Sequence, residues 1–267
     1  MSGACRLAAL CLGLLSLLSG PVLASEPPSA TPVNHRPARL SLIIDDLGQH
    51  PARDRRVLAL PGPVALAILP DTRHAGSLAE QAHRAGKTVL LHLPMAPAGG
   101  RFAWQPHLPH AELQRRLQAA LLAVPHVSGV NNHMGSTMTE QPQAMTQLMR
   151  DLQRRHLFFL DSRTSPNTVA AASAQRENLA SLSRDVFLDD DASPAAVAER
   201  FQAAIALARR QGSAVIIGHP HDSTLTLLER ELPRLAARGI EWIDLGQMIA
   251  IRGNRAMAAH GTQGIYR

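Results

Sequence analysis

The residues best suited to acid–base or metal chemistry fall in five short clusters along the chain. These clusters are Asp45-Asp46, His92, Asn131-Asn132-His133, Asp161-Ser162-Arg163-Thr164 and Gly218-His219-Pro220-His221. Carboxylates and imidazoles bind zinc and similar ions, and the same groups accept and donate protons. If the fold brings the clusters together, they could hold a divalent ion and activate a water molecule for hydrolysis.

The N-terminus has the pattern of a Sec-type signal peptide. Arg6 supplies a positive charge, the uncharged apolar run Leu7–Leu18 follows, and small residues precede a cleavage site after Ala24. We therefore expect residues 1–24 to be removed on export to the periplasm. The alternative is a retained anchor helix, but the apolar run is short for a membrane span of about 20 residues.

Cysteine usage narrows the chemistry of the exported chain. Cys5 and Cys11 both lie in the expected signal peptide, so the mature protein would carry neither a disulfide nor a thiolate ligand. Any metal must then be held by His, Asp or Glu. A nucleophile must be a hydroxyl, a carboxylate or an activated water.

Beyond a linker rich in Pro, Ser and Ala at residues 25–38, short apolar runs alternate with stretches of helical period. The expected strands are Leu40–Ile44, Val64–Ile68, Thr88–Leu93, Val127–Asn131, Leu157–Leu160, Val186–Leu188, Ala214–Ile217 and Ile240–Ile243. The expected helices are Pro51–Leu60, Ser77–Ala85, His110–Leu122, Gln141–Arg154, Val169–Leu179, Pro194–Gln211 and Leu225–Ala237.

This alternation predicts parallel strands joined by crossover helices. Seven or eight such units favour an α/β fold of the distorted (β/α) barrel type with about seven strands, in a single domain at residues 39–252. An open doubly wound sheet is the alternative. No later stretch is long and apolar enough to span a membrane, and residues 253–267 are expected to form a disordered tail.

The five polar clusters all follow predicted strands. In parallel α/β folds, functional sites form at the carboxyl ends of the strands. Each cluster alone has a local explanation, such as a turn or a helix N-cap, but their shared position predicts one site. The run Asp189-Asp190-Asp191 before Ser193 suits a helix N-terminus, although it also follows a strand and could lie at the edge of the site.

Composition and missing motifs exclude several classes of protein. The formal charge of +6 comes almost entirely from arginine spread along helices, without a basic block interleaved with aromatics, so nucleic-acid binding is not expected. Such a surface would suit an anionic envelope polymer or membrane surface, or it could be ordinary solvated helix faces. The chain has no Gly-rich phosphate loop and no Gly-x-Ser-x-Gly elbow. Of two tryptophans, Trp104 lies in the loop after the third predicted strand and is the one expected near the rim of the site.

Several motifs together resemble the divergent polysaccharide deacetylase family, a remote branch of carbohydrate esterases with a NodB-type fold. They are Ile-Ile-Asp-Asp-Leu-Gly, Leu-His-Leu-Pro-Met, Asn-Asn-His-Met-Gly-Ser, Phe-Phe-Leu-Asp-Ser-Arg-Thr and Gly-His-Pro-His, in that order over about residues 39–250. The resemblance implies a distorted barrel of about seven strands in a periplasmic or cell-envelope setting.

The resemblance also implies roles for the paired acids and the metal ligands. In NodB-type deacetylases the first Asp of the pair is the catalytic base and the second binds the metal, which places these roles on Asp45 and Asp46. His92 matches the first of two metal-binding histidines spaced four residues apart. Ala96 occupies the second position, and His133 at the neighbouring strand end is the expected replacement. Zinc is the expected ion, with manganese, cobalt and nickel as alternatives.

The remaining catalytic roles follow the same resemblance. His219 matches the histidine that acts as the catalytic acid, and Arg163 is the candidate for the arginine that orients the base. Asp161 could orient His219 or tune its pKa by charge. The sequence leaves open whether His133 or His221 exchanges roles with the named ligands.

Two hypotheses of function therefore stand, with a third behind them. The first is a metal-dependent hydrolase that deacetylates N-acetylated sugars of envelope polysaccharide, a peptidoglycan-like glycan included. The second is a non-catalytic envelope protein that binds a glycan or a partner protein with a degenerate site. The third is a metal-dependent phosphodiesterase or amidase. Loss of turnover with retention of metal in Asp45→Asn would favour the first over the second.

Overall fold

The computed structural model describes residues 38–261, with side chains described to Gly253. Nine parallel strands of this region form one sheet. They are β1 (Ala38–Leu47), β2 (Val64–Ile68), β3 (Thr88–Met95), β4 (Val127–Met134), β5 (Phe158–Asp161), β6 (Ser181–Ser183), β7 (Val186–Phe187), β8 (Ser213–Gly218) and β9 (Ile240–Trp242).

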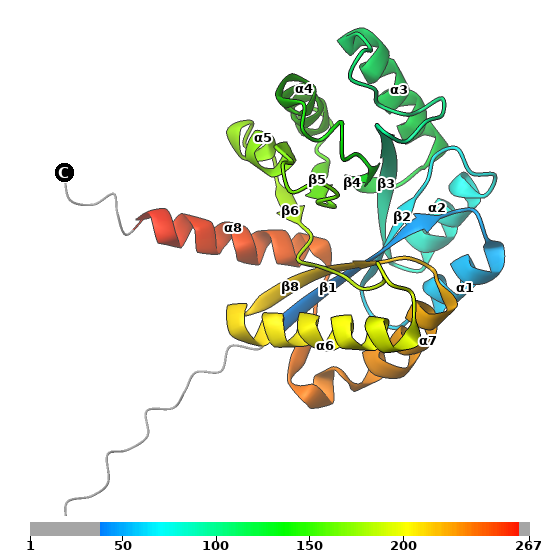
Figure 1. Cartoon of the computed structure of the whole chain (residues 1–267), viewed down its shortest axis with the longest axis vertical. Coiled ribbons are helices and arrows are strands. Elements are labelled where there is room, and N and C mark those ends of the chain that lie inside the picture. Colours follow the sequence, from blue (N-terminus) through cyan, green and yellow to red (C-terminus); the bar gives the residue numbers. More distant parts are fainter. Residues whose placement is uncertain (1–37, 262–267) are drawn as a thin grey trace, which may run out of the picture. The chain divides into compact units, whose positions relative to one another are not determined.

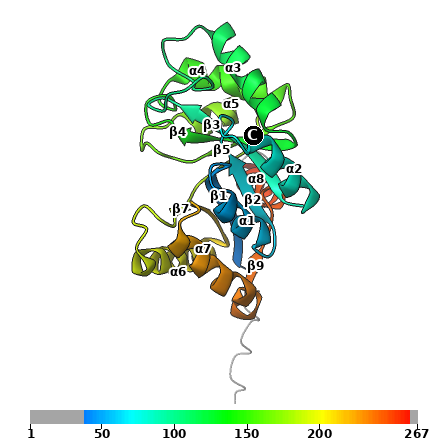
Figure 2. The same cartoon turned by 90° about the vertical axis from the view of Figure 1, so that its right-hand side faces the viewer.

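The connections between successive strands are mostly helical, as the alternating sequence pattern predicts. The helices are α1 (Pro51–Ala59), α2 (Ala75–Arg84), α3 (His110–Ala123), α4 (Pro142–Gln153), α5 (Ala170–Arg176), α6 (Pro194–Gln211), α7 (Asp222–Glu231), the short 3-10 turns η1 (Leu232–Arg234) and η2 (Ala236–Arg238), and α8 (Leu245–Gly261). Figure 2 shows α1 and α2 lying over the outer face of β1 and β2.

The strand order β6-β5-β4-β3-β2-β1-β8-β7 makes the sheet a curled half-barrel, which confirms the predicted distorted barrel (Figure 1). The break in the wall lies between β6 and β7, which only Arg184 and Asp185 connect. At this break the carboxylate of Asp185 accepts a hydrogen bond from the backbone N–H of Val215, at 2.7 Å. The N–H of Val215 therefore has a hydrogen-bond partner although no described strand residue pairs with it there.

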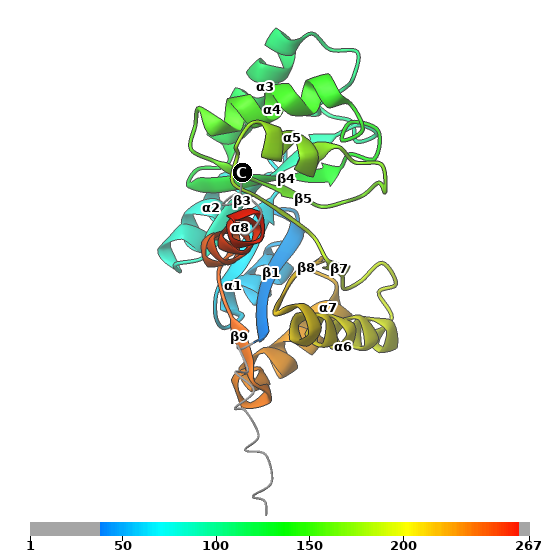
Figure 3. The same cartoon turned by 90° about the vertical axis from the view of Figure 1, so that its left-hand side faces the viewer.

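Side chains along each strand alternate between two apolar layers. Leu40, Leu42 and Ile44 of β1 pack outward with the surrounding helices. Ile43 points inward, where residues from β2, β3, β5, β6 and β8 meet the first turns of α8 through Leu245 and Met248. Figure 3 shows α8 in front of the concave side of the sheet. The interior of the half-barrel is therefore filled in part by the start of a helix.

Two details differ from the sequence-based expectation, whereas the last predicted strand is confirmed. The strand β6 was not expected, because Ser181–Ser183 contains one apolar residue between two serines. The predicted strand Ile240–Ile243 corresponds to β9, which pairs with the start of β1 beside β2. Regular structure continues past the expected limit at Gly253, since α8 extends to Gly261.

The expected signal peptide and nearly all of the expected linker lie outside the described residues. Within residues 38–261, no helix is both long enough and apolar enough to cross a membrane.

Candidate metal centre

A break in the regular geometry of β1 brings both carboxylates of the Asp pair to one place. Consecutive strand residues normally point to opposite faces. Here the register with β2 shifts between Ile44 and Leu47, and Asp46 takes a left-handed φ of +57°. As a result, Asp45 Oδ2 lies 3.7 Å and Asp46 Oδ1 lies 3.1 Å from Nε2 of His92.

Asp46, His92 and His133 converge with their ligand atoms facing one another. His133 Nδ1 is 2.9 Å from Asp46 Oδ1 and 3.2 Å from His92 Nε2. The parallel pairing of β3 with β4 sets this arrangement by placing Pro94 opposite His133. The structure thus brings together all three residues predicted as metal ligands.

The orphaned oxygen of Asp46 tests whether these residues fit a metal ion. Asp46 Oδ1 is buried and has no hydrogen-bond partner of acceptable geometry among the described residues. A buried carboxylate oxygen without a partner is costly, and a divalent cation would satisfy it. One carboxylate and two imidazoles are also a common ligand set of catalytic zinc sites. The residues therefore fit a divalent ion such as Zn²⁺.

The two carboxylates differ in pKa because their surroundings differ. Burial alone would raise the pKa of Asp46, but the imidazoles of His133 and His92 outweigh it and hold that pKa far below its usual range. Burial raises the pKa of Asp45 despite the opposing charges of His92 and His219. One carboxylate is thus suited to remain an anionic ligand, and the other to accept a proton.

Asn131 connects the base candidate to the first histidine. Its side-chain N–H donates to Asp45 Oδ1 at 2.9 Å, and its carbonyl oxygen lies 2.9 Å from His92 Nδ1. Because an amide oxygen can only accept, His92 Nδ1 must carry a proton, which leaves Nε2 as the nitrogen that faces Asp46 and would bind a metal ion. The sequence placed Asn131 in a site cluster but could not assign it this contact.

His219, which follows β8, is held by Asp189, which follows the neighbouring strand β7. His219 Nδ1 lies 2.9 Å from Asp189 Oδ1, and the other oxygen accepts from the backbone N–H of His219 at 2.6 Å and from Thr224 Oγ1 at 2.7 Å. Burial lowers the pKa of His219, but the bond to Asp189 and the charge of Asp45 outweigh it and raise the pKa to about 9. His219 is therefore protonated at neutral pH.

Two predicted roles fall to other residues in the structure. Asp161 is buried, but it accepts from the backbone N–H of Arg163 at 2.8 Å and from Thr168 Oγ1 at 3.0 Å, so it shapes its own loop and does not contact His219. Asp189 makes that contact instead. The side chain of Arg163 is exposed, and the base candidate is oriented by Asn131.

Trp104 lies in the loop after β3, as expected, but its indole is not exposed at the rim. It is fully buried and pairs through its backbone with Pro94, to which its N–H donates at 2.9 Å. The loop after β3 folds back on the strand and encloses the indole. Within the described region, no tryptophan therefore presents a stacking surface at the metal centre.

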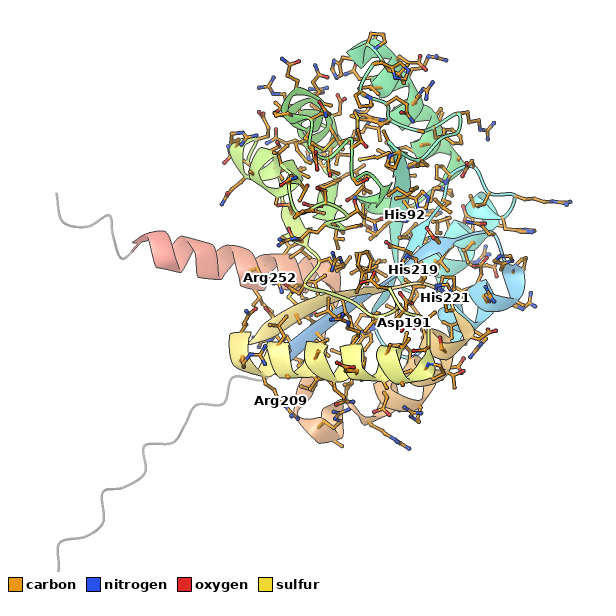
Figure 4. The ribbon with its side chains drawn as sticks, viewed as in Figure 1. His92, Asp191, Arg209, His219, His221 and Arg252 are labelled. Atoms are coloured by element: carbon orange, nitrogen blue, oxygen red, sulfur yellow. The ribbon has the colours of Figure 1, made fainter. Side chains whose placement is uncertain are left out.

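Two hollows are lined by candidate metal ligands. A cleft of about 570 Å³ lies on the His133 side, bounded among others by Gln49, Arg73 and Met134. A smaller hollow of about 150 Å³ contains Asp46 itself with His219 and His221. In Figure 4, His92 and His219 lie near each other at the centre, with His221 beside His219. The candidate metal ligands thus line a larger cleft at His133 and a smaller hollow at Asp46.

The half-barrel with an Asp–His centre at its strand ends defines a protein of the carbohydrate deacetylase fold. The chain belongs to the divergent polysaccharide deacetylase family, whose model matches residues 42–249. It is 40% identical over 225 residues to the uncharacterized protein YibQ of Escherichia coli (strain K12). The match covers 83% of this chain and 66% of YibQ, so the chain spans just under two thirds of that relative.

Solved structures share the fold. The uncharacterized protein ATU2773 from Agrobacterium tumefaciens C58 aligns with a TM-score of 0.76 at 22% identity, covering 80% of this chain and 90% of that one. The catalytic domain of a peptidoglycan N-acetylglucosamine deacetylase from Eubacterium rectale aligns at 0.52 and 15%, covering 82% and 93%. BA3943, a CE4 family pseudoenzyme from Bacillus anthracis, aligns at 0.52 and 13%, covering 80% and 66%.

Proposed function

We propose that this protein is an exported, metal-dependent hydrolase that removes acetyl groups from N-acetylated sugars of an envelope polysaccharide. The observation that carries the proposal is the convergence of Asp46, His92 and His133 on one point, with Asp45 beside it. Family membership supports a glycan substrate. Proteins of similar fold include both a deacetylase and a pseudoenzyme, so the fold alone does not indicate turnover. The proposal of catalysis therefore depends on these site residues.

Asp46, His92 and His133 would hold the metal ion. A bound Zn²⁺ supplies Lewis acidity, which lowers the pKa of a water molecule and polarises an acyl carbonyl. Asn131 and the bulge of β1 orient two of these ligands before any ion arrives. Such preorganisation is worth a substantial part of metal affinity.

Asp45 is placed to act as the general base. The residue is 2% exposed, and its side chain lies beside the three candidate ligands without being one of them. Its pKa is raised by burial, so it accepts a proton from the attacking water more readily than an ordinary carboxylate does. The hydrogen bond from Asn131 fixes one oxygen and leaves the other, Oδ2, toward the metal centre.

His219 is placed to act as the general acid. Its Nδ1 is engaged by Asp189, so the Nε2–H remains to protonate the departing amine. Hydrolysis adds one water across the amide: the hydroxyl goes to the acetyl carbon, and the proton goes to the sugar nitrogen. Acetate and a free amine result. Asp45 and His219 thus divide the two proton transfers.

The first experiment measures bound metal by mass spectrometry in the wild type, His92→Ala and His126→Ala. We expect about one divalent ion per chain in the wild type, loss of that ion in His92→Ala, and its retention in His126→Ala. His126 is the matched control because it pairs with Glu80 at 3.0 Å, away from the centre. A wild type that stays metal-free after incubation with zinc would refute the proposal and favour a binding protein.

Turnover is tested with Asp45→Asn on an N-acetylated oligosaccharide. General-base catalysis contributes about 10²- to 10⁴-fold, so we expect the variant to lose at least about 10²-fold in kcat while it keeps the metal. If the wild type binds metal but releases no acetate from any oligosaccharide, the site binds glycan without hydrolysing it. An unchanged kcat in Asp45→Asn would reject the assignment of the base.

Export is tested by N-terminal sequencing of protein recovered from the periplasm. The positive charge at Arg6 and the apolar run after it support cleavage following Ala24. Recovery of an uncleaved chain in the membrane fraction would instead favour a retained anchor.

A further inference from the structure

The smaller hollow beside Asp46 is lined almost entirely by polar and basic side chains. Its lining residues are Asp46, Gln49, His50, Arg53, His219, Pro220 and His221. Its volume of about 150 Å³ is below the range of about 300 to 1,000 Å³ typical of ligand sites. The hollow can therefore take a substituent of a substrate rather than a sugar chain.

Arg53 brings a positive charge that is only weakly compensated. Its nearest carboxylate is that of Asp222, with Nη2 to Oδ2 at 3.7 Å, and this pair forms no hydrogen bond. Asp222 is 72% exposed and lies closer to Arg56, at 3.1 Å. An exposed pair at this separation contributes little. The guanidinium of Arg53 thus retains donors for an anion.

The histidines of the hollow also have donors to spare. No hydrogen bond from the side chain of His50 or His221 to another described residue is found. His221 stands beside His219, with ring centroids 5.9 Å apart. His219 is itself protonated at neutral pH. A cationic imidazole, a guanidinium and two further imidazoles therefore line one small space together with the carboxylate of Asp46, which a bound metal ion would neutralise.

The backbone at two helix starts adds to the positive electrostatic potential of the hollow. His50 and His221 are the N-caps of α1 and α7, and neither helix start has a side-chain cap. The free N–H groups of a first turn carry partial positive charge. Asp54 in the first turn of α1 and Asp222 in the first turn of α7 offset part of it, although Asp54 is engaged by the backbone N–H of Gly48 and Asp222 by Arg56. Two helix ends thus reinforce a charge that the side chains supply.

We propose that this hollow binds an anionic substituent, a carboxylate or a phosphate, on the sugar that is deacetylated or on its neighbour. This inference rests on the proposed function, because His219 connects the two. As the acid, His219 must approach the sugar nitrogen, and it also lines the hollow. Groups attached close to that nitrogen are then within reach of Arg53. The substrate class is an anionic N-acetylated glycan.

The test compares kcat/KM on three N-acetylated tetrasaccharides of equal length: one neutral, one with lactyl carboxylates and one with phosphate esters. We expect the metal-loaded wild type to prefer an anionic tetrasaccharide by about tenfold or more, the size of one charge-assisted hydrogen bond. The two anionic substrates distinguish carboxylate from phosphate as the favoured group. Equal values on all three would overturn the inference.

Arg53→Gln and Arg55→Gln provide the matched variants. Arg55 lies on the same helix but is exposed and lines a different hollow. We expect Arg53→Gln to lose about tenfold in kcat/KM on the preferred anionic substrate and less than about twofold on the neutral one. Arg55→Gln should match the wild type on both. Equal losses on charged and neutral substrates in Arg53→Gln would contradict the assignment.

Calorimetric binding in the metal-loaded Asp45→Asn background separates this inference from the proposed function. We expect the anionic tetrasaccharide to bind, and Arg53→Gln in the same background to weaken it about tenfold. If this difference in binding is seen although the wild type hydrolyses none of the substrates, the anion site is supported and the proposed hydrolase activity is rejected. If the wild type hydrolyses all three substrates with equal kcat/KM, the hydrolase activity is supported and the anion site is rejected.

Discussion

Asn131 and Asp189 each fix where the proton of one histidine resides. Asn131 accepts from Nδ1 of His92, which turns the lone pair of Nε2 toward the metal centre. Asp189 accepts from Nδ1 of His219, which leaves Nε2–H for proton donation. The two histidines have similar intrinsic chemistry, so their different partners decide that one acts as a ligand and the other as an acid.

Replacing Asp189 with Asn should change the pH dependence of turnover. An acid must be protonated, so activity falls as pH rises through the pKa of His219, which is about 9 in the wild type. Without the Asp189 carboxylate we expect that pKa to fall toward its ordinary value of about 6.5. The kcat of Asp189→Asn should therefore decline at lower pH than that of the wild type.

The measurement is kcat from pH 5.5 to 10 for the wild type, Asp189→Asn and Asp161→Asn. Asp161 is the control, since it is a buried carboxylate that contacts its own loop rather than His219. An alkaline limb that stays in place in Asp189→Asn, or shifts equally in Asp161→Asn, would argue against the pairing.

Replacing Asn131 with Leu should weaken metal binding. The change removes the acceptor for His92 Nδ1 and leaves the metal-facing tautomer unsupported. Loss of such an outer partner costs about 10- to 100-fold in metal affinity. Competition with a chelator would measure it, with the exposed Asn167→Ala as control. Affinity equal to that of the wild type would show that Asn131 does not orient His92.

At the scale of elements, the turn between β1 and α1 presents the Asp pair. Asp54 on α1 is buried and accepts from the backbone N–H of Gly48 at 3.3 Å, which ties the end of β1 to the next helix. Gly48 has a φ of +102°, and a Cβ there would lie 2.3 Å from Thr72 Oγ1. The bulge that delivers Asp46 therefore requires glycine two residues later.

Gly48→Ala should destabilise the protein and weaken its metal binding together. The left-handed backbone costs about 1–2 kcal/mol for a non-glycine residue, and overpacking adds about 1–3 kcal/mol. Gly86→Ala shares the positive φ, at +68°, but has no atom within 4 Å of its Cβ. Urea unfolding should show the smaller loss in Gly86→Ala. Equal losses would mean that contact with Thr72 is unimportant.

At the scale of the described domain, the half-barrel is stabilised from inside by α8. Met248 is fully buried between inward residues of the sheet, and Ile43 belongs to the same cluster. An incomplete wall leaves apolar strand faces that need a cover, and the start of α8 provides it. The strand ends that hold the metal centre therefore depend on a helix close to the C-terminal end of the described region.

Met248→Ala should lower the free energy of unfolding by about 2–5 kcal/mol, as large-to-small core substitutions do. Leu122→Ala is the control, because Leu122 is 75% exposed, and surface changes stay within about 0.5 kcal/mol. Urea denaturation measures both. A Met248→Ala protein as stable as Leu122→Ala would indicate that α8 is not part of the cooperative core.

The sequence by itself determined the elements and the ends at which chemistry gathers. Alternating apolar runs and helical periods are local signals, and parallel strands bring their carboxyl ends to one edge. Asp46, His92 and His133 could therefore be grouped before their distances were known. The strand β6 was not predicted, because its Ser-Leu-Ser sequence has only one apolar residue.

Only the tertiary structure decided which carboxylate serves His219. Asp161 ends β5, far along the sheet from β8, whereas the chain crosses the gap after β6 and lays β7 directly beside β8. That pairing brings Asp189 to His219, and no local sequence pattern predicts this contact. The bulge of β1 likewise depends on its pairing with β2, and the burial of Trp104 depends on the loop after β3 folding back onto that strand. Local periodicity specifies elements, while the partners of a side chain depend on how those elements pair.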